Sequence, residues 1–308
     1  MTSVFVVAHQ QRSEACALVL AAADWLQARG HEMWLSHEDA QALGVADLGS
    51  DRDPASAGLA LSLGGDGTML RTVQLLDGAA VPIIGVNVGL LGYLTEVEPP
   101  GLLAALERWF GNDAGAGAWR IEERMMLHVE LIRHTVTDGD GVAGDGVAGD
   151  GVAEECVAGE VWRALNEVVL EKGRSGHTVR LDVSIDGSPF TSYAADGLIV
   201  ATPTGSTAYS LSARGPVVSP QHRAILLTPV SPHMLFDRSL VLDPDEPVSI
   251  KVSGYRTVEM SIDGQRVATL SEGDTVRCSP AHETARFVRF GPRRFHQILK
   301  AKFGLSDR

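Results

Sequence analysis

The 308-residue chain has little lysine, and this scarcity limits how it can hold an anionic ligand. Lysine occurs only at Lys172, Lys251, Lys300 and Lys302, and Asp plus Glu outnumber Lys plus Arg by 39 to 26. The resulting net charge of −13 argues against a general nucleic-acid or anionic-membrane surface. A phosphate ligand must therefore be held mainly by backbone N–H groups, arginine and a divalent cation.

The chain is also poor in cysteine and has no long apolar run. Cys16, Cys156 and Cys278 are far apart, without a CxxC pair or a neighbouring histidine pair, as in reduced proteins that lack a structural zinc. No apolar run approaches the ~20 residues that would span a bilayer, and residues 1–9 lack the basic start of a signal peptide. We expect a cytoplasmic protein with neither membrane nor nucleic acid as a partner.

Strands and helices alternate in residues 1–118. Apolar β-rich runs predict strands at 3–9, 32–35, 58–63 and 81–86. Helical periodicity predicts helices at 13–30, 68–76 and 99–110, the first capped by Ser13, and the polar stretch 44–57 is typical of a linker. This alternation predicts a Rossmann-like α/β domain with a parallel sheet covered on both faces.

Beyond the glycine-rich stretch 111–117, the pattern changes to short alternating strands. The runs 126–132, 179–185, 248–252 and 258–262 are strand-like, and Asp-Gly pairs at 186 and 263 favour hairpin turns. We therefore expect a second domain over 119–289, mostly antiparallel and β-sandwich-like. Residues 290–308, with a predicted helix at 295–303, are expected to pack back on the first domain.

A five-residue repeat, Gly-Asp-Gly-Val-Ala, begins at Gly139 and recurs at Gly144 and Gly149. It carries no bulky side chain that could bury surface, so it predicts a flexible insertion over 139–153. The repeat also generates a Gly-x-Gly-x-x-Gly match at 139–144. We reject that dinucleotide fingerprint because no helix follows it.

The first motif with chemical content is Gly64-Gly65-Asp66-Gly67-Thr68, between an apolar strand and a helix. The glycines let the backbone approach a ligand, and unpaired N–H groups at a helix N-terminus bind phosphates. Open α/β sheets bind ligands at such strand ends, and Asp66 is the only acid in the loop. The alternative is a tight turn in which Asp66 caps the helix.

Two further motifs lie in the second half. Asn166 and Glu167 are adjacent in an apolar run, which indicates recognition of hydroxyl or amino groups, unless one of them merely pairs with a turn. In the run 196–212, a strand leads into a Pro/Gly turn and a helix start rich in hydroxyls, which predicts a phosphate or sugar site. Capping by Thr204 or Ser206 explains only one or two of those hydroxyls.

Together these segments resemble the NAD kinase family over nearly the whole chain. Lipid kinases of the diacylglycerol and sphingosine type share the Gly-Gly-Asp-Gly-Thr loop, and phosphofructokinases have a similar one. The long run Thr-Pro-Thr-Gly-Ser-Thr-Ala-Tyr at 202–209 is absent from both groups, so it discriminates. The segments 85–87, 91–94, 231–235 and 263–265 also resemble NAD kinase segments.

The resemblance implies an N-terminal α/β domain, a C-terminal β-sandwich-like domain and NAD held between them. It also implies phosphorylation of the 2′-hydroxyl of the adenosine ribose of NAD to give NADP, with Asp66 as the catalytic general base. Gly64, Gly65, Gly67 and Thr68 would bind the donor phosphates. The residues implied to bind NAD are Asp66, Gly67, Arg71, Asn166, Glu167, His177, Ala194, Asp196, Thr207, Ala208, Tyr209, Ser210, Leu211, Ser212 and Gln265.

The expected phosphoryl donor is ATP, another nucleoside triphosphate or polyphosphate, with Mg²⁺ held mainly through the phosphates and no metal-binding residue assigned. The resemblance also implies a homo-oligomer, a dimer or a tetramer. Two other functions stay open: a lipid or sugar kinase that shares the glycine loop, and a dinucleotide sensor without catalysis. A carboxylate at Asp66 argues against the sensor, since binding alone does not call for an acid beside phosphates.

Overall fold

The computed structural model describes residues 1–111, 119–136, 154–174, 176–292 and 295–305. The chain forms two compact units, one of residues 1–124 with 283–308 and the other of residues 125–282. Strands β5 (Arg120–Val136) and β16 (Thr275–Arg289) each contribute to both units. The predicted insertion at 139–153, and all of the predicted boundary 111–117 except Gly111, lie outside the described residues.

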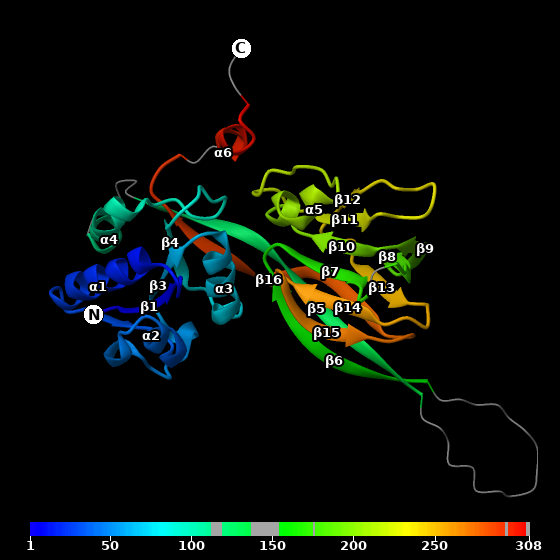
Figure 1. Cartoon of the computed structure of the whole chain (residues 1–308), viewed down its shortest axis with the longest axis horizontal. Coiled ribbons are helices and arrows are strands. Elements are labelled where there is room, and N and C mark those ends of the chain that lie inside the picture. The colour runs from blue at the N-terminus through cyan, green and yellow to red at the C-terminus, as the bar shows by residue number, and fades with distance from the viewer. Residues whose placement is uncertain (112–118, 137–153, 175, 293–294, 306–308) are drawn as a thin grey trace, which may run out of the picture. The chain divides into compact units, whose positions relative to one another are not determined.

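The first unit contains a parallel sheet with the strand order β2-β1-β3-β4-β16. Figure 1 labels β1, β3, β4 and β16 of this sheet. Its strands are β1 (Ser3–Ala8), β2 (Glu32–Trp34), β3 (Leu59–Gly64), β4 (Pro82–Asn87) and the end of β16, at Arg286 and Phe287. This confirms the α/β prediction. Because β2 and β3 flank β1 on opposite sides, the strand order reverses between β1 and β3, and ligands bind at such reversals.

Helices cover both faces of this sheet. Helices α1 (Ser13–Gln27) and α4 (Leu102–Phe110) bury apolar residues in the core that includes Ile84 and Val86 of β4. Helix α3 (Asp66–Leu76) packs on the other face, where a Cβ at Gly85 would lie 2.6 Å from the sulfur of Met69. The remaining elements of this unit are α2 (His37–Ala42), α6 (Phe295–Lys302) and the 3-10 turns η1 (Ala46–Leu48), η2 (Pro54–Ser56) and η3 (Pro99–Gly101).

One local expectation for this unit was wrong, and one short helix was not predicted. Helix α1 begins at Ser13, but Arg12 occupies the N-cap position and no side chain caps the helix, so Ser13 is not the cap. Helix α2 was missed, because its six residues, His-Glu-Asp-Ala-Gln-Ala, are too short and too polar to show apolar periodicity. It is capped by Ser36, whose hydroxyl accepts the backbone N–H of Asp39 at 3.2 Å.

The second unit consists of two largely antiparallel sheets. One sheet has the order β12-β11-β10-β7-β14-β15. The other contains, as consecutive neighbours, β9, β8, β13 and the start of β16, and it also includes β5 and β6. The strands not yet bounded are β6 (Glu154–Ala164), β7 (Glu167–Lys172), β8 (Val179–Ile185), β9 (Ser188–Ala195), β10 (Gly197–Ala201), β11 (Ile225–Val230), β12 (Leu240–Leu242), β13 (Val248–Val252), β14 (Val258–Ile262) and β15 (Gln265–Leu270).

The core of the second unit lies between its two sheets. Alternate residues of β7 and β10, such as Leu170 and Val200, share one apolar cluster with Leu181 of β8 and Ile250 of β13. Two sheets that bury alternate residues against each other form a sandwich, which confirms the predicted architecture. The turn η4 (Gly205–Thr207) and helix α5 (Tyr209–Ser212) follow β10. In the described ranges, no helix is both long and apolar enough to cross a membrane.

Candidate active site

A pocket of about 500 Å³ lies where β1 and β3 end, at the reversal of strand order in the first unit. The backbone N–H of His9 donates to the carbonyl of Leu63 at 2.9 Å, which keeps the two strand ends together. The pocket is lined by Ala8, His9, Gln10, Gln11, Arg12, Gly65, Gly67, Thr68 and Arg71. Its volume is within the usual range for small-ligand sites.

The lining of this pocket is suited to an anion. Helix α3 begins at Asp66, so the partial positive charge of its N-terminus is next to the glycine loop. Arg12 and Arg71 supply the cationic side chains of the lining. The fully buried Asp39 orients Arg71, since its Oδ1 lies 2.8 Å from Nη2 of Arg71 and accepts Nε2 of Gln10 at 2.8 Å.

Asp66 does not cap helix α3, whose N-cap is Gly65. Its carboxylate instead turns to the segment after β4, where Oδ2 accepts the backbone N–H of Tyr93 and Oδ1 that of Leu94, each at 2.8 Å. Each oxygen of an ionised carboxylate has capacity for a further hydrogen bond. The alternative of a capping Asp66 is therefore wrong, and the acid is held in one orientation beside the glycine loop.

In the second unit, Asp263 fixes the turn that carries Asn166 and Glu167. Its carboxylate accepts three consecutive backbone N–H groups, from Leu165 at 2.8 Å, Asn166 at 2.7 Å and Glu167 at 3.0 Å. Asp263 is buried and has a φ of 47° in the turn that follows β14. Asp263 is absent from the residues assigned by sequence, although an aspartate next to an apolar strand was an available signal.

Glu167 itself is buried beside Asp263. Burial and then the charge of Asp263 raise the pKa of Glu167 to about 8, despite the backbone N–H of Tyr209, which lowers it. Burial also raises the pKa of Asp263, while the three N–H groups that donate to its carboxylate favour the charged form and oppose that rise. With its pKa raised to about 8, Glu167 is mainly protonated at neutral pH and offers an O–H donor.

Most hydroxyls in the run 202–212 bond within the fold. Thr202 Oγ1 donates to the carbonyl of Leu165 at 2.6 Å and Ser206 Oγ to that of Pro203 at 2.7 Å, while Ser210 Oγ lies 3.2 Å from Oγ1 of Thr228. Thr207 Oγ1 similarly donates to the carbonyl of Thr204 at 3.4 Å. Helix α5 has only four residues, so the predicted phosphate site at a helix N-terminus lacks the aligned dipoles of a longer helix.

The remaining predicted NAD-binding residues are distributed over neighbouring elements of the second unit. Asp196 pairs with Lys172, with 2.5 Å between Oδ1 and Nζ. His177 and Ala194 line two adjacent pockets that share Tyr255 and Arg256. Tyr209, Ser212 and Gln265 are exposed, and Ala208 and Leu211 are partly buried. The carbonyl of Ala194 accepts the backbone N–H of His233 at 2.7 Å.

Protein side chains alone do not make a metal centre in the described part of the chain. No group of three or more His, Cys, Asp or Glu side chains is arranged there to hold a metal ion.

Comparison with known proteins places the chain in one family. The description of the ATP-NAD kinase N-terminal domain matches residues 4–114, and that of the C-terminal domain matches residues 165–290. The NAD kinase of Heliobacterium modesticaldum is 39% identical over 304 residues, which cover 98% of each chain. The NAD kinase of Symbiobacterium thermophilum is 39% identical over 280 residues, 90% of each chain.

Solved structures support the same fold. The yeast NADH kinase complexed with NADH superimposes with a TM-score of 0.79 at 24% identity, over 100% of this chain and 89% of that one. An NAD kinase from Archaeoglobus fulgidus in complex with ATP has a TM-score of 0.66 at 20% identity, over 99% of this chain and 98% of that one. With both domain descriptions matched and relatives of 39% identity covering nearly its full length, the chain belongs to the NAD kinase family of phosphotransferases.

Proposed function

We propose that this enzyme transfers the terminal phosphoryl group of ATP to the 2′-hydroxyl of the adenosine ribose of NAD, with Asp66 as general base. The 2′-oxygen forms a bond to the γ-phosphorus, the bond from that phosphorus to the bridging oxygen breaks, and ADP leaves. The proton of the hydroxyl goes to the Asp66 carboxylate. The observation that carries the proposal is the fixed carboxylate of Asp66 beside the glycine loop.

The geometry of Asp66 supports the role of base. Two backbone N–H groups hold its oxygens in place, so the carboxylate does not need to be ordered when substrate binds. Phosphoryl transfer through a loose transition state depends mainly on positioning and charge stabilisation. A carboxylate held in this way orients the attacking hydroxyl and accepts its proton.

The pocket between the ends of β1 and β3 supports the placement of the donor phosphates. It combines the N-terminus of α3 with Arg12 and Arg71, which is the phosphate-binding chemistry left to a lysine-poor chain. The family description names ATP. Two arginines do not balance the charge of a triphosphate, so we propose that ATP enters as its Mg²⁺ complex.

The second unit supports recognition of NAD. The turn held by Asp263 presents the amide of Asn166 next to Glu167, which offers an O–H donor at neutral pH. Together an amide and a protonated carboxyl both donate and accept hydrogen bonds, as recognition of a nucleoside requires. We also propose that the enzyme acts in the cytoplasm and forms a homo-oligomer. Light scattering after gel filtration measures the oligomeric state.

Product analysis tests the function directly. Purified protein is given NAD and Mg²⁺ with either ATP or polyphosphate, and NADP is measured through an NADP-specific dehydrogenase. We expect NADP with ATP. NADP formed only from polyphosphate would change the donor, whereas NAD binding without NADP would favour the sensor. Absence of NAD binding would favour a kinase acting on a non-nucleotide alcohol.

A further inference from the structure

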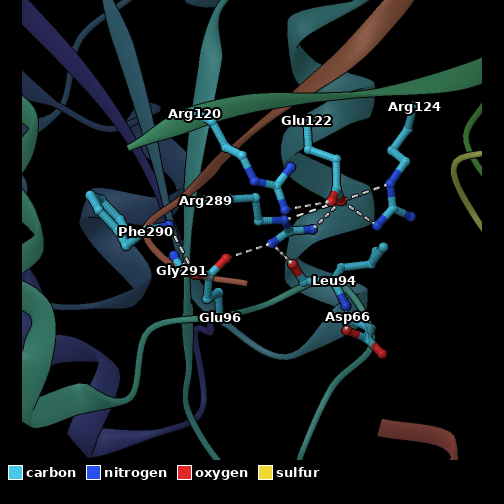
Figure 2. Close-up of polar contacts among 9 residues, drawn as sticks. All are labelled: Asp66, Leu94, Glu96, Arg120, Glu122, Arg124, Arg289, Phe290 and Gly291. Atoms are coloured by element: carbon cyan, nitrogen blue, oxygen red, sulfur yellow. Dashed lines mark hydrogen bonds and ion pairs between the residues drawn. The ribbon is translucent and has the colours of Figure 1, made fainter. Parts of the chain in front are cut away.

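Leu94 is bonded from two directions in the first unit. Its N–H donates to Oδ1 of Asp66 at 2.8 Å, and its carbonyl accepts Nη1 of Arg289 at 2.9 Å. Figure 2 shows Arg289 on the side of Leu94 away from Asp66. The backbone that orients the proposed base is thus itself held by a guanidinium from the end of β16.

Arg289 is among the most deeply buried side chains, at 1% exposure. Its Nη2 and Nε lie 3.0 and 3.2 Å from Oε1 of Glu122, and its Nη1 lies 3.5 Å from Oε2 of Glu96 (Figure 2). A guanidinium holds several oxygens in fixed directions because its donors form a rigid planar fork. The ammonium group of a lysine at this position cannot donate to both the Leu94 carbonyl and the Glu122 carboxylate in the same geometry.

Glu122 anchors the far side of this network. It also pairs with Arg124, which is buried, and with Arg120, whose Nη2 lies 3.6 Å from Oε2. Burial by itself would raise the pKa of Glu122, but the guanidiniums of Arg289 and Arg124 outweigh it and hold the pKa at about 2. Glu122 is therefore ionised throughout the working pH range, and Arg289 keeps its counter-charge.

Glu96 ties the same loop to the chain beyond β16 at a second point. Its Oε1 accepts the backbone N–H groups of Phe290 at 2.9 Å and Gly291 at 3.1 Å. Residues 93–96 are thus connected to Asp66 on one side and to residues 289–291 on the other. Apolar residues often stabilise a core as well as buried ion pairs do, so stability alone does not explain a charged cluster here.

We propose that Arg289 is a positioning residue for catalysis: it holds the Leu94 backbone so that the Asp66 carboxylate stays oriented toward the attacking hydroxyl. The inference rests on the proposed function, since it takes Asp66 as the base. Arg289 touches neither substrate. Its loss should lower the rate of phosphoryl transfer while leaving substrate binding nearly unchanged.

The test compares Arg289→Lys with Arg286→Met. Arg286 is on the same strand and also pairs with a glutamate, with 3.3 Å between its Nε and Oε1 of Glu123, but the side chains are 39% and 54% exposed rather than buried. For Arg289→Lys we expect kcat to fall 10- to 100-fold, with KM for NAD and ATP changed less than threefold. For Arg286→Met we expect kcat within twofold of wild type. A folded Arg289→Lys enzyme with wild-type kcat would overturn the inference.

A double-mutant cycle separates positioning from a general structural role. If Arg289 acts through Asp66, Arg289→Lys should cost less than threefold in the Asp66→Asn background, although it costs at least tenfold alone. Independent multiplication of the two effects would overturn the inference. The single variant Asp66→Asn tests the proposed base independently of the Arg289 variants. Full activity of Asp66→Asn would refute the proposed base.

A second variant keeps the test decisive if Arg289→Lys does not fold. Glu96→Ala removes the other connection of the loop but leaves the pairs of Glu122 with Arg289 and Arg124 in place. We expect kcat to fall 5- to 10-fold, unchanged KM values, and no further loss in the Asp66→Asn background. An unchanged kcat in Glu96→Ala would contradict the account of the loop.

Discussion

Gly92 and Asp66 are so close that no side chain fits at position 92. A Cβ built on Gly92 would lie 2.4 Å from Oδ1 of Asp66, 3.1 Å from its Cγ and 2.8 Å from Oγ1 of Thr95. Real Cβ atoms essentially never approach other atoms within 3.0 Å. The glycine of the segment 91–94 is therefore explained by the space that the proposed base occupies.

Gly92→Ala should displace the Asp66 carboxylate without removing it. A misplacement of about 1 Å costs roughly 100-fold in rate, so we expect kcat to fall by about that factor, or ~2.7 kcal/mol of transition-state stabilisation. Gly101→Ala is the matched control, because a Cβ there would make an ordinary contact, 3.4 Å from Cγ1 of Val97. Steady-state kinetics on both variants checks this, and wild-type kcat in Gly92→Ala would contradict it.

Arg71→Ala should weaken binding of the donor. Charge-assisted hydrogen bonds contribute ~1.5–3 kcal/mol, so we expect KM for ATP to rise about 10- to 100-fold while KM for NAD changes little. Arg52→Ala, which loses an exposed pair with Glu32, should leave both values unchanged. A rise in KM for NAD alone would instead support the assignment of Arg71 to NAD that the family resemblance implies.

Asp263→Asn should loosen the turn at Asn166 and Glu167. An amide has one acceptor oxygen in place of two and brings a donor group of its own to N–H groups that need acceptors, so we expect a loss of ~2–4 kcal/mol in the free energy of unfolding. KM for NAD should rise at least tenfold. Asp186, also in an Asp-Gly turn with positive φ, is exposed, and Asp186→Asn should cost less than ~0.5 kcal/mol.

The raised pKa of Glu167 predicts a pH-dependent stability. Between its ordinary value of 4.5 and about 8, the unfolded chain has released this proton and the folded chain keeps it. The contribution of this group to the free energy of unfolding therefore falls as pH rises, by at most ~1.4 kcal/mol per unit, and is constant above pH 8.

Glu167→Gln removes that titration. The free energy of unfolding of Glu167→Gln minus that of wild type should increase from pH 5 to pH 8 and stay constant above pH 8. Denaturant unfolding at pH 5, 6.5, 8 and 9 measures this, with Glu171→Gln on the same strand as control. A difference that stays constant across pH would show that Glu167 is ionised in the folded protein.

The parts of the site that sequence reasoning found are local in the chain. An apolar strand, a glycine loop and an amphipathic helix follow one another at 59–76, so their pattern alone predicts a ligand loop with Asp66 in it. The sandwich followed from short alternating strands for the same reason. The sugar or phosphate site at 196–212 stays a prediction, and sequence does not show that Thr202 and Ser206 donate to nearby carbonyls.

The parts of the site that sequence reasoning missed depend on contacts between residues far apart in the chain. Asp263 accepts the N–H of Leu165 across 98 positions, and Arg289 reaches the carbonyl of Leu94 across 195. Arg120, Glu122 and Arg124 alternate along β5, which places them on one face, but only the fold reveals that Arg289 completes the cluster. An arginine within the apolar run 287–290 was the one local signal.

The central claim is that Asp66 takes the proton of the attacking hydroxyl, and the rate of NADP formation in a single turnover of Asp66→Asn tests it most directly. Asp77→Asn, at the other end of α3, is the control, since asparagine tolerates the left-handed backbone at that position. We predict that Asp66→Asn binds NAD and ATP normally but forms NADP at least 100-fold more slowly than wild type, a loss of about 3 kcal/mol. NADP formation at the wild-type rate in Asp66→Asn would contradict the account.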